Sequence, residues 1–127
     1  MHINRKQLRR SRSAALLNSP QRRSYVIRLR IITPRKPNSA KRSCVKVKLT
    51  TKKGVHAYIH GSGHNLRKYS KILIRGGGAR DLPGVRYSTI RGVLDLMPAP
   101  NKTKRRTIYG LSFKKAYSIP YKKNYFV

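Results

Sequence analysis

The stretch 45–60 reads VKVKLTTKKGVHAYIH, and its pattern decides the fold. Apolar and polar residues alternate in 45–49 and again in 55–59, which gives each segment one apolar face if it is a strand. Between them, Thr-Lys-Lys-Gly at 51–54 is typical of a turn, because glycine permits backbone conformations that other residues avoid. The sequence therefore predicts a β-hairpin with one apolar face.

Further strand signals flank this hairpin. Residues 25–32 suit a first strand, Ile72-Leu73-Ile74 forms a short apolar run before three glycines, and 85–94 is a β-branched stretch opened by Pro83-Gly84. These signals amount to five short strands with glycine-rich turns and no convincing helical period. The expected fold class is all-β: a five-stranded, OB-fold-type barrel of the kind used by nucleic-acid binders, with a long basic N-terminal arm and an extended C-terminal tail.

The charge of the chain points to its partner. Its 127 residues include 32 Lys and Arg but only Asp81 and Asp95 as acidic residues, which gives a formal net charge of +30. Self-repulsion on this scale opposes a compact state, and a polyanion neutralises it with release of counterions. We therefore expect a nucleic-acid partner. No apolar run approaches the length of a membrane span, so no membrane association is expected, and the lone Cys44 favours a reducing compartment.

Composition divides the chain into three regions. Residues 1–24 form a basic arm that we expect to thread through RNA and to be ordered only by its partner, although it also resembles a mitochondrial transit peptide. Residues 25–97 hold the barrel, and 98–127 form a basic and aromatic tail. In the tail an aromatic residue recurs every four positions, at Tyr109, Phe113, Tyr117, Tyr121 and Tyr125. This spacing suits a short amphipathic helix, but Pro120 interrupts it, and docking on RNA or a neighbouring protein is favoured.

Catalytic and metal-binding patterns are weak. The absence of Glu and the separation of the two aspartates leave few groups for acid-base catalysis or magnesium binding. His56 and His60 would share a strand face about 13 Å apart, too far for one ion, and His64 follows in a turn. The chain is therefore expected to be no enzyme and to hold no metal or cofactor. A cationic nuclease that uses these histidines and a histone-like DNA compactor stay open as alternatives.

Several segments resemble one known family. The segment 33–40, TPRKPNSA, is similar to the TPKKPNSA loop of the universal small-subunit ribosomal protein twelve, and further segments follow that family in order and spacing. They are SPQRR at 19–23, GHNL at 63–66, ILIRGG at 72–77, DLPGVRY at 81–87 and RGVLD at 91–95. The resemblance covers about residues 19–110. It implies a structural constituent of the small ribosomal subunit that binds rRNA at the decoding centre and contributes to accurate tRNA selection. Its partners would be small-subunit rRNA, neighbouring ribosomal proteins, and tRNA and elongation factors at the A site.

The resemblance also implies two sets of site residues. The first is the decoding loop with its flanks: Thr33, Pro34, Arg35, Lys36, Pro37, Asn38, Ser39, Lys41 and Arg42. The second comprises Arg75, Arg80, Asp81, Leu82, Pro83, Gly84, Arg86 and Tyr87. Asp81 is also the candidate for modification, because the matching aspartate of bacterial members carries a methylthio group. From its charge alone, we expect Asp81 to orient neighbouring arginines of its own loop rather than to face phosphate; a simple turn aspartate before Leu82-Pro83 is the alternative.

Departures from the bacterial pattern indicate the compartment. The tail after Gly110 is longer than in bacterial members, Ser19 and Ser24 replace the usual Cys and Gly, and Lys, Ile and Tyr are enriched. These features favour a mitochondrial ribosome, in the matrix, over a plastid or bacterial one. Because the arm follows the family pattern almost from its start, synthesis inside the mitochondrion is favoured over import.

Overall fold

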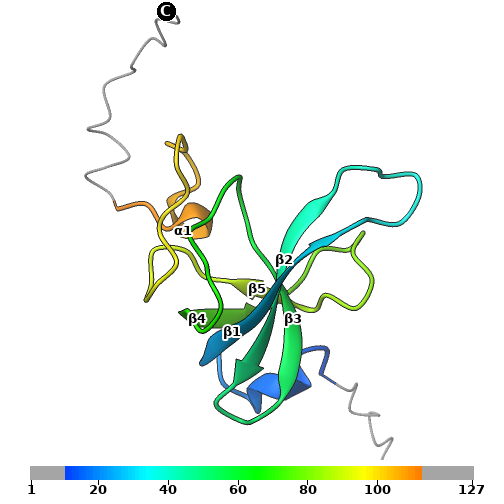
Figure 1. The fold of residues 1–127 in the computed structure, drawn as a ribbon, viewed down its shortest axis with the longest axis vertical. Coiled ribbons are helices and arrows are strands. Elements are labelled where there is room, and N and C mark those ends of the chain that lie inside the picture. Colours follow the sequence, from blue (N-terminus) through cyan, green and yellow to red (C-terminus); the bar gives the residue numbers. More distant parts are fainter. Residues whose placement is uncertain (1–10, 113–127) are drawn as a thin grey trace, which may run out of the picture.

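The computed structural model describes residues 11–112 and shows a closed five-stranded barrel with very little helix (Figure 1). The strands are β1 (Gln21–Ile32), β2 (Arg42–Leu49), β3 (Gly54–Tyr58), β4 (Lys71–Gly76) and β5 (Tyr87–Thr89), ordered β1-β2-β3-β5-β4 around the barrel. The predicted all-β barrel is therefore confirmed. No helix among the described residues is long and apolar enough to cross a membrane.

The predicted hairpin is present as β2 and β3. The strands are antiparallel, with Val45 opposite Ala57 and Val47 opposite Val55. Val45, Val47 and Ala57 are fully buried, whereas the intervening lysines are only partly buried. The turn at 51–54 closes through a hydrogen bond from the Leu49 N–H to the Lys53 carbonyl, 2.9 Å long. The alternating pattern thus sets both the register and the face that enters the core.

A β-bulge between Val26 and Arg28 divides β1 into two parts. Before the bulge, residues 21–25 pair with β4 and residues 24–26 pair with β2, so this part belongs to the closed sheet. After it, residues 28–32 pair with 42–46 of β2. Because a bulge bends the strand and increases its twist, the β1–β2 ladder leaves the barrel and carries the 33–41 connection outward (Figure 1).

The strand β5 closes the barrel with few contacts. It pairs in parallel with β3 at Ala57–Tyr87 and Tyr58–Ser88, and antiparallel with β4. The prediction of a longer strand over 85–94 was wrong: β5 covers only Tyr87–Thr89. The chain leaves the sheet because Gly92 and Leu94 adopt positive φ angles of 77° and 54° and build a turn. β-branched composition indicated a strand but could not reveal this turn.

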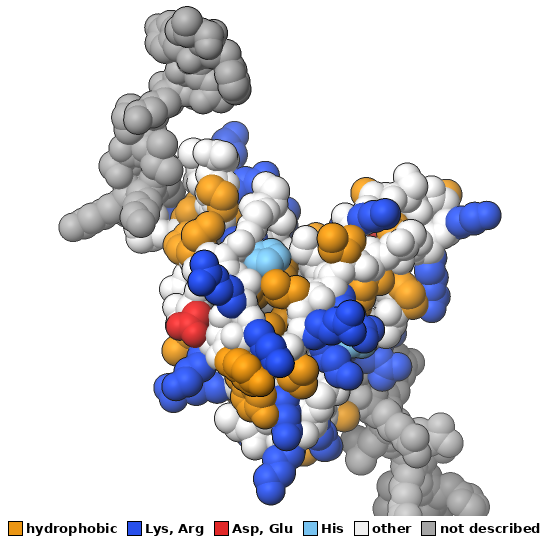
Figure 2. All heavy atoms as spheres, in the orientation of Figure 1, with side chains coloured by type: hydrophobic (Ala, Val, Ile, Leu, Met, Phe, Trp, Pro, Cys, Tyr) orange, Lys and Arg blue, Asp and Glu red, His pale blue; other side chains and the backbone are white. Residues whose placement is uncertain are grey.

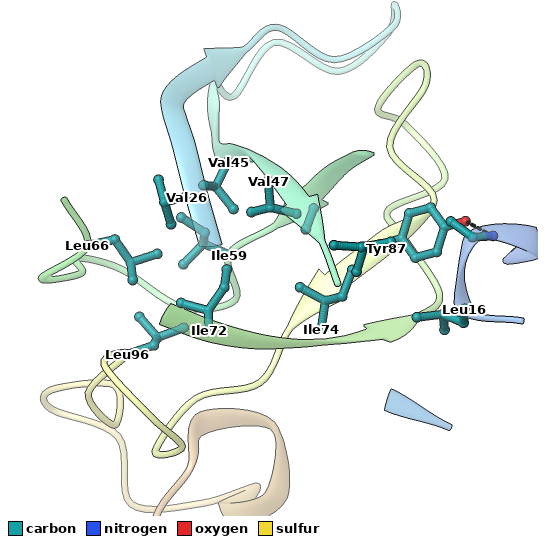
Figure 3. Packing of buried hydrophobic residues seen from close by; sticks show 13 residues of the cluster. Leu16, Val26, Val45, Val47, Ile59, Leu66, Ile72, Ile74, Tyr87 and Leu96 are labelled. Carbon is teal, nitrogen blue, oxygen red and sulfur yellow. Dashed lines mark hydrogen bonds between the residues drawn. The ribbon is translucent and has the colours of Figure 1, made fainter. Parts of the chain in front are cut away.

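The core fills the barrel and extends to the residues before β1. Its buried members are Ala15, Leu16, Val26, Val45, Val47, Leu49, Ala57, Ile59, Leu66, Ile72, Ile74, Tyr87 and Leu96. Figure 3 shows the aliphatic side chains meeting inside the sheet, with the Tyr87 ring at one end. There the Tyr87 hydroxyl accepts a hydrogen bond of 3.1 Å from the Ala15 N–H, which lies in the 3-10 turn η1 (Ala14–Leu16).

Both ends of the barrel region differ from the expected boundaries. The first strand starts at Gln21, not at Tyr25, so 21–24 belong to the sheet, and Leu16 is 3% exposed. At the other end, the segment from residue 98 packs back onto the barrel and includes the short helix α1 (Arg106–Tyr109). The Ala99 N–H donates to the Tyr109 carbonyl at 2.9 Å. Of the predicted aromatic series only Tyr109 lies within the described residues.

Two close backbone contacts and one buried arginine hold the 98–110 segment against the barrel. A side chain on Gly110 would overlap the Arg91 carbonyl group, and one on Gly92 would approach the Gly110 oxygen to 2.7 Å. The Arg91 side chain is 2% exposed and donates to the carbonyls of His60, Gly63 and Met97. Burial lowers the pKa of Arg91, but each of its three nitrogen atoms donates to a carbonyl, which offsets the cost of burial. Arg91 therefore ties the loop after β3 to the segment after β5.

We predict that Gly110→Ala releases the 98–110 segment. Its φ of +66° disfavours a side chain, and the added methyl group would collide with Arg91. The expected loss is roughly 2 to 4 kcal/mol in the free energy of unfolding, measured by urea titration of the RNA-free protein. Gly63→Ala is the control, because Gly63 has a similar φ of +74° but open space around its Cβ position. It should lose roughly 1 kcal/mol. Equal losses would contradict the packing role of Gly110.

We also predict that Cys44 resists alkylation in the folded protein. It is 1% exposed, and burial raises the pKa of its thiol from 9.0 to about 11. At pH 8 the thiolate fraction should then be roughly 100-fold lower than for an ordinary thiol, apart from any steric protection. Iodoacetamide labelling followed by mass spectrometry measures the rate, with urea-unfolded protein as the reference. Comparable rates in the two states would contradict the prediction.

Candidate functional site

Two loops lie side by side on the part of the barrel away from α1 (Figure 1). One connects β1 to β2 and contains 33–41, and the other connects β4 to β5 and contains 77–86. A backbone hydrogen bond of 2.9 Å from the Arg35 N–H to the Asp81 carbonyl joins them. Within the first loop, the Asn38 N–H donates to the Arg35 carbonyl at 3.0 Å, which forms a tight turn around the cis Lys36–Pro37 peptide.

The Asp81 carboxylate forms the main side-chain link between these loops. Its Oδ2 atom lies 2.8 Å from Nη2 of Arg42 in a salt bridge and 3.4 Å from Nδ2 of Asn38. The pKa of Arg42 is raised by a hydrogen bond to Tyr58 and by the negative charge of Asp81. Asp81 thus orients an arginine, as expected, but the arginine belongs to the start of β2 and not to its own loop. We call the 33–42 and 79–86 segments, joined in this way, the paired loops.

A small apolar cluster supports the paired loops from below. Cys44, Leu82 and Val85 are buried there, and Ile32, Tyr58 and Ala79 pack against them. Gly78 allows the chain to pass close to Val85, because a Cβ at this position would overlap the Val85 carbonyl oxygen. The exposed tips therefore rest on a packed base, which restricts their motion.

The predicted site residues in these loops differ in burial. Exposed residues in the paired loops are Thr33, Arg35, Lys36, Pro37, Asn38, Ser39, Lys41, Arg80, Pro83, Gly84 and Arg86, and Arg42 and Asp81 are partly buried. Pro34, Leu82 and Tyr87 are buried. Tyr87 belongs to the barrel core and bonds to Ala15, so the structure gives it a packing role.

Arg75 lies apart from the other predicted residues. It is on β4, opposite Gln21 of β1, and its Nη2 atom is 3.5 Å from Nε2 of His60. The sequence analysis considered His60 as a metal ligand and as a nuclease residue, and its contact with Arg75 was not foreseen. No sequence spacing indicates this pair, because barrel closure alone brings residues 60 and 75 together.

Cationic side chains far outnumber acidic ones on the described surface. Lys and Arg side chains occupy much of the face seen in Figure 2, whereas acidic side chains are nearly absent from it. Both acidic side chains of the chain are engaged: Asp81 with Arg42, and Asp95 with the Lys71 N–H at 2.6 Å. Within residues 11–112, no group of three or more His, Cys, Asp or Glu side chains could hold a metal ion. The exposed lysines and arginines of the loops can therefore donate hydrogen bonds to anions.

Comparison with known proteins assigns this arrangement to a family. The family model for ribosomal protein S12/S23 matches residues 9–111. The chain belongs to this family. A Small ribosomal subunit protein uS12m of Paramecium tetraurelia is 61% identical over 81% of the chain and 74% of the relative. A second protein of that name, from Bigelowiella natans, is 48% identical over 89% of the chain and 90% of the relative. The predicted resemblance is confirmed, and the chain is of the mitochondrial type.

Membership of the S12/S23 family resolves the general class of the protein. It is a structural protein of the small ribosomal subunit and not an enzyme, so its association is with the ribosome, which implies rRNA and other ribosomal proteins as partners. The two alternatives left open by the sequence, a cationic nuclease and a DNA compactor, are thereby rejected. The high positive charge is accounted for by embedding in RNA.

We predict that Asp81→Lys impairs incorporation into the small subunit more than Asp81→Asn does. The asparagine can still accept a hydrogen bond from Arg42, whereas a lysine places a third cation beside Arg42 and Arg80. The measurement is competition between tagged variant and wild-type protein for assembly into subunits. Arg42→Gln is the partner substitution: if Asp81 acts through Arg42, the double variant with Asp81→Asn should be little worse than either single one. Additive effects would contradict a shared role.

Proposed function

We propose that the paired loops bind small-subunit rRNA at the decoding centre of the mitochondrial ribosome and contribute there to accurate tRNA selection. The observation that carries this proposal is the joining of the two predicted loops by Asp81, through the Arg35 backbone and the Arg42 side chain. Two segments about forty residues apart in the sequence thus form one exposed surface, which supports a common binding function.

The chemistry of this surface suits RNA with a defined shape. Arg35 and Lys36 are exposed and can contact phosphates, whereas Asn38 and Ser39 can donate to and accept from sugar hydroxyls. The 2′-hydroxyls and base edges of the RNA minor groove display the geometry of base pairing. The phosphate contacts would hold the loop in position, and the polar pair would sense the geometry of the codon paired with the incoming tRNA.

The supported position of the loop favours a sensing role. Pro34 is buried and Pro37 restricts its own backbone, so the tip of the loop has little conformational entropy to lose on docking. The Asp81–Arg42 pair and the apolar cluster below it fix the second loop relative to the first. A preformed surface can distinguish correct from incorrect minor-groove geometry, because it does not adapt to both. Transfer RNA and elongation factors at the A site are the proposed transient partners.

A simpler role of the same loop is a clamp on rRNA, and substitutions separate the two. Ser39→Ala should mainly increase misreading of near-cognate codons, with a cost of about 1 kcal/mol for the lost hydrogen bond. Lys36→Ala should weaken binding and growth generally, because it removes a phosphate contact. The measurement is a misreading reporter in a bacterial ribosome that carries the equivalent substitutions.

Matched controls come from exposed positions remote from the paired loops. Ser62→Ala removes a hydroxyl from the exposed turn after β3, and Lys53→Ala removes a cation from the β2–β3 turn. Neither should change the error rate. If Ser39→Ala and Lys36→Ala both slow assembly but leave error rates and the aminoglycoside response at wild-type values, the loop is a clamp and the decoding role is wrong.

A further inference from the structure

A cavity of about 250 Å³ lies between the barrel and α1, on a part of the molecule that the paired loops do not include. Its polar lining comes from Gln21 at the start of β1, His60 after β3, Arg75 on β4 and Thr107 in α1. Ile90 and Ile108 provide apolar walls. At about 30 Å³ per water molecule, the cavity has room for several water-sized groups.

The polar lining consists of groups that can donate hydrogen bonds. Arg75 carries five N–H donors, of which one, on Nη1, donates to the Gly76 carbonyl at 3.2 Å, while Nη2 lies beside the His60 ring. Gln21 and Thr107 are exposed and contribute an amide and a hydroxyl. The Thr89 hydroxyl, which also borders the cavity, already donates to the Tyr58 carbonyl at 3.1 Å.

Positive charge accumulates here, and no carboxylate among residues 11–112 lines the cavity to balance it. Burial lowers the pKa of His60, and the charges of Arg75, Arg91 and Arg105 lower it further. Arg91 is held by its backbone carbonyl acceptors, and the Tyr58 ring packs edge-on against His60 with centroids 4.8 Å apart. The two acidic side chains of the chain are engaged elsewhere, with Arg42 and with the Lys71 N–H. An anion in the cavity would therefore be attracted by several cations and repelled by no carboxylate.

We propose that this cavity binds a phosphate group, with Arg75, His60 and Thr107 as its direct ligands. A planar guanidinium is the side chain best matched to phosphate oxygens, and the neighbouring imidazole and hydroxyl supply further donors. Because Arg75 is on β4 and Thr107 is in α1, the bound phosphate would link the barrel to α1. The phosphate group would belong either to the RNA backbone or to a free phosphate compound, since both present the same oxygens.

The test uses the imidazole protons of full-length protein, observed by NMR while inorganic phosphate is added at constant ionic strength. Phosphate should shift the His60 signal and raise the pKa of His60, because an adjacent anion stabilises the imidazolium. His56 and His64 report from the same spectra as internal controls, since neither lines this cavity. Absence of a His60 response, or an equal response of His56, His60 and His64, would overturn the proposal.

Substitutions identify the ligands. Arg75→Gln should weaken the phosphate response of His60 by about tenfold or more, the usual loss for a charged hydrogen bond. Arg67→Gln removes an exposed arginine outside the cavity and should change the phosphate response of His60 by less than about twofold. Thr107→Glu provides a second variant at an exposed site that leaves the barrel intact, and its carboxylate should by itself raise the pKa of His60 and exclude phosphate. Unchanged phosphate binding in both Arg75→Gln and Thr107→Glu would overturn the assignment.

A tethered iron probe distinguishes the two sources of phosphate. An iron chelate attached to Thr107→Cys in reconstituted small subunits should cleave rRNA beside the cavity if the RNA backbone supplies the group. Buried Cys44 should not compete for the label. A His60 response to phosphate without cleavage would assign the site to a free phosphate compound. If Arg75→Gln loses phosphate binding but keeps normal decoding accuracy, the phosphate site and the function proposed for the paired loops are independent of each other.

Discussion

Positive charge with almost no internal counter-charge is the constraint on which this structure depends. A net charge of +30 over 127 residues opposes compaction, so the fold must be secured by interactions that do not require carboxylates. The closed barrel does this with an apolar core and a sheet whose strands all have two neighbours. The two aspartates are placed at loop contacts: Asp81 joins the paired loops, and Asp95 holds the start of β4.

The same constraint explains how Arg91 can be buried. A buried cation normally requires a carboxylate partner, and its absence is costly unless other acceptors replace it. Here the backbone supplies them, because the carbonyls of His60, Gly63 and Met97 converge on the guanidinium. Desolvation lowers the pKa of Arg91, but an arginine stays protonated over the physiological range. An arginine bound by backbone carbonyls can therefore hold loops together in a protein with only two acidic residues.

The sequence predicted the features that depend on local pattern. The β2–β3 hairpin was predicted because Val45 and Val47 alternate with lysines, and this alternation alone determines which side chains enter the core. The length of β5 was not predicted, because positive φ angles at Gly92 and Leu94 are properties of the backbone that composition does not display. The Asp81–Arg42 and Arg75–His60 contacts were also missed. Both join residues from different strands or loops, and such neighbours are determined by how the barrel closes.

The short pairing between β3 and β5, which we call the seam, has a consequence for the order of folding. The β1–β2 and β2–β3 pairings join neighbouring strands through short connections, whereas β3 and β5 meet at only two residue pairs across the 59–86 segment. Closing so long a connection costs entropy before the few contacts of the seam repay it. The three-stranded meander should therefore form early and the seam last. During that interval the meander would present open sheet edges along β1 and β3, which are the edges later covered by β4 and β5.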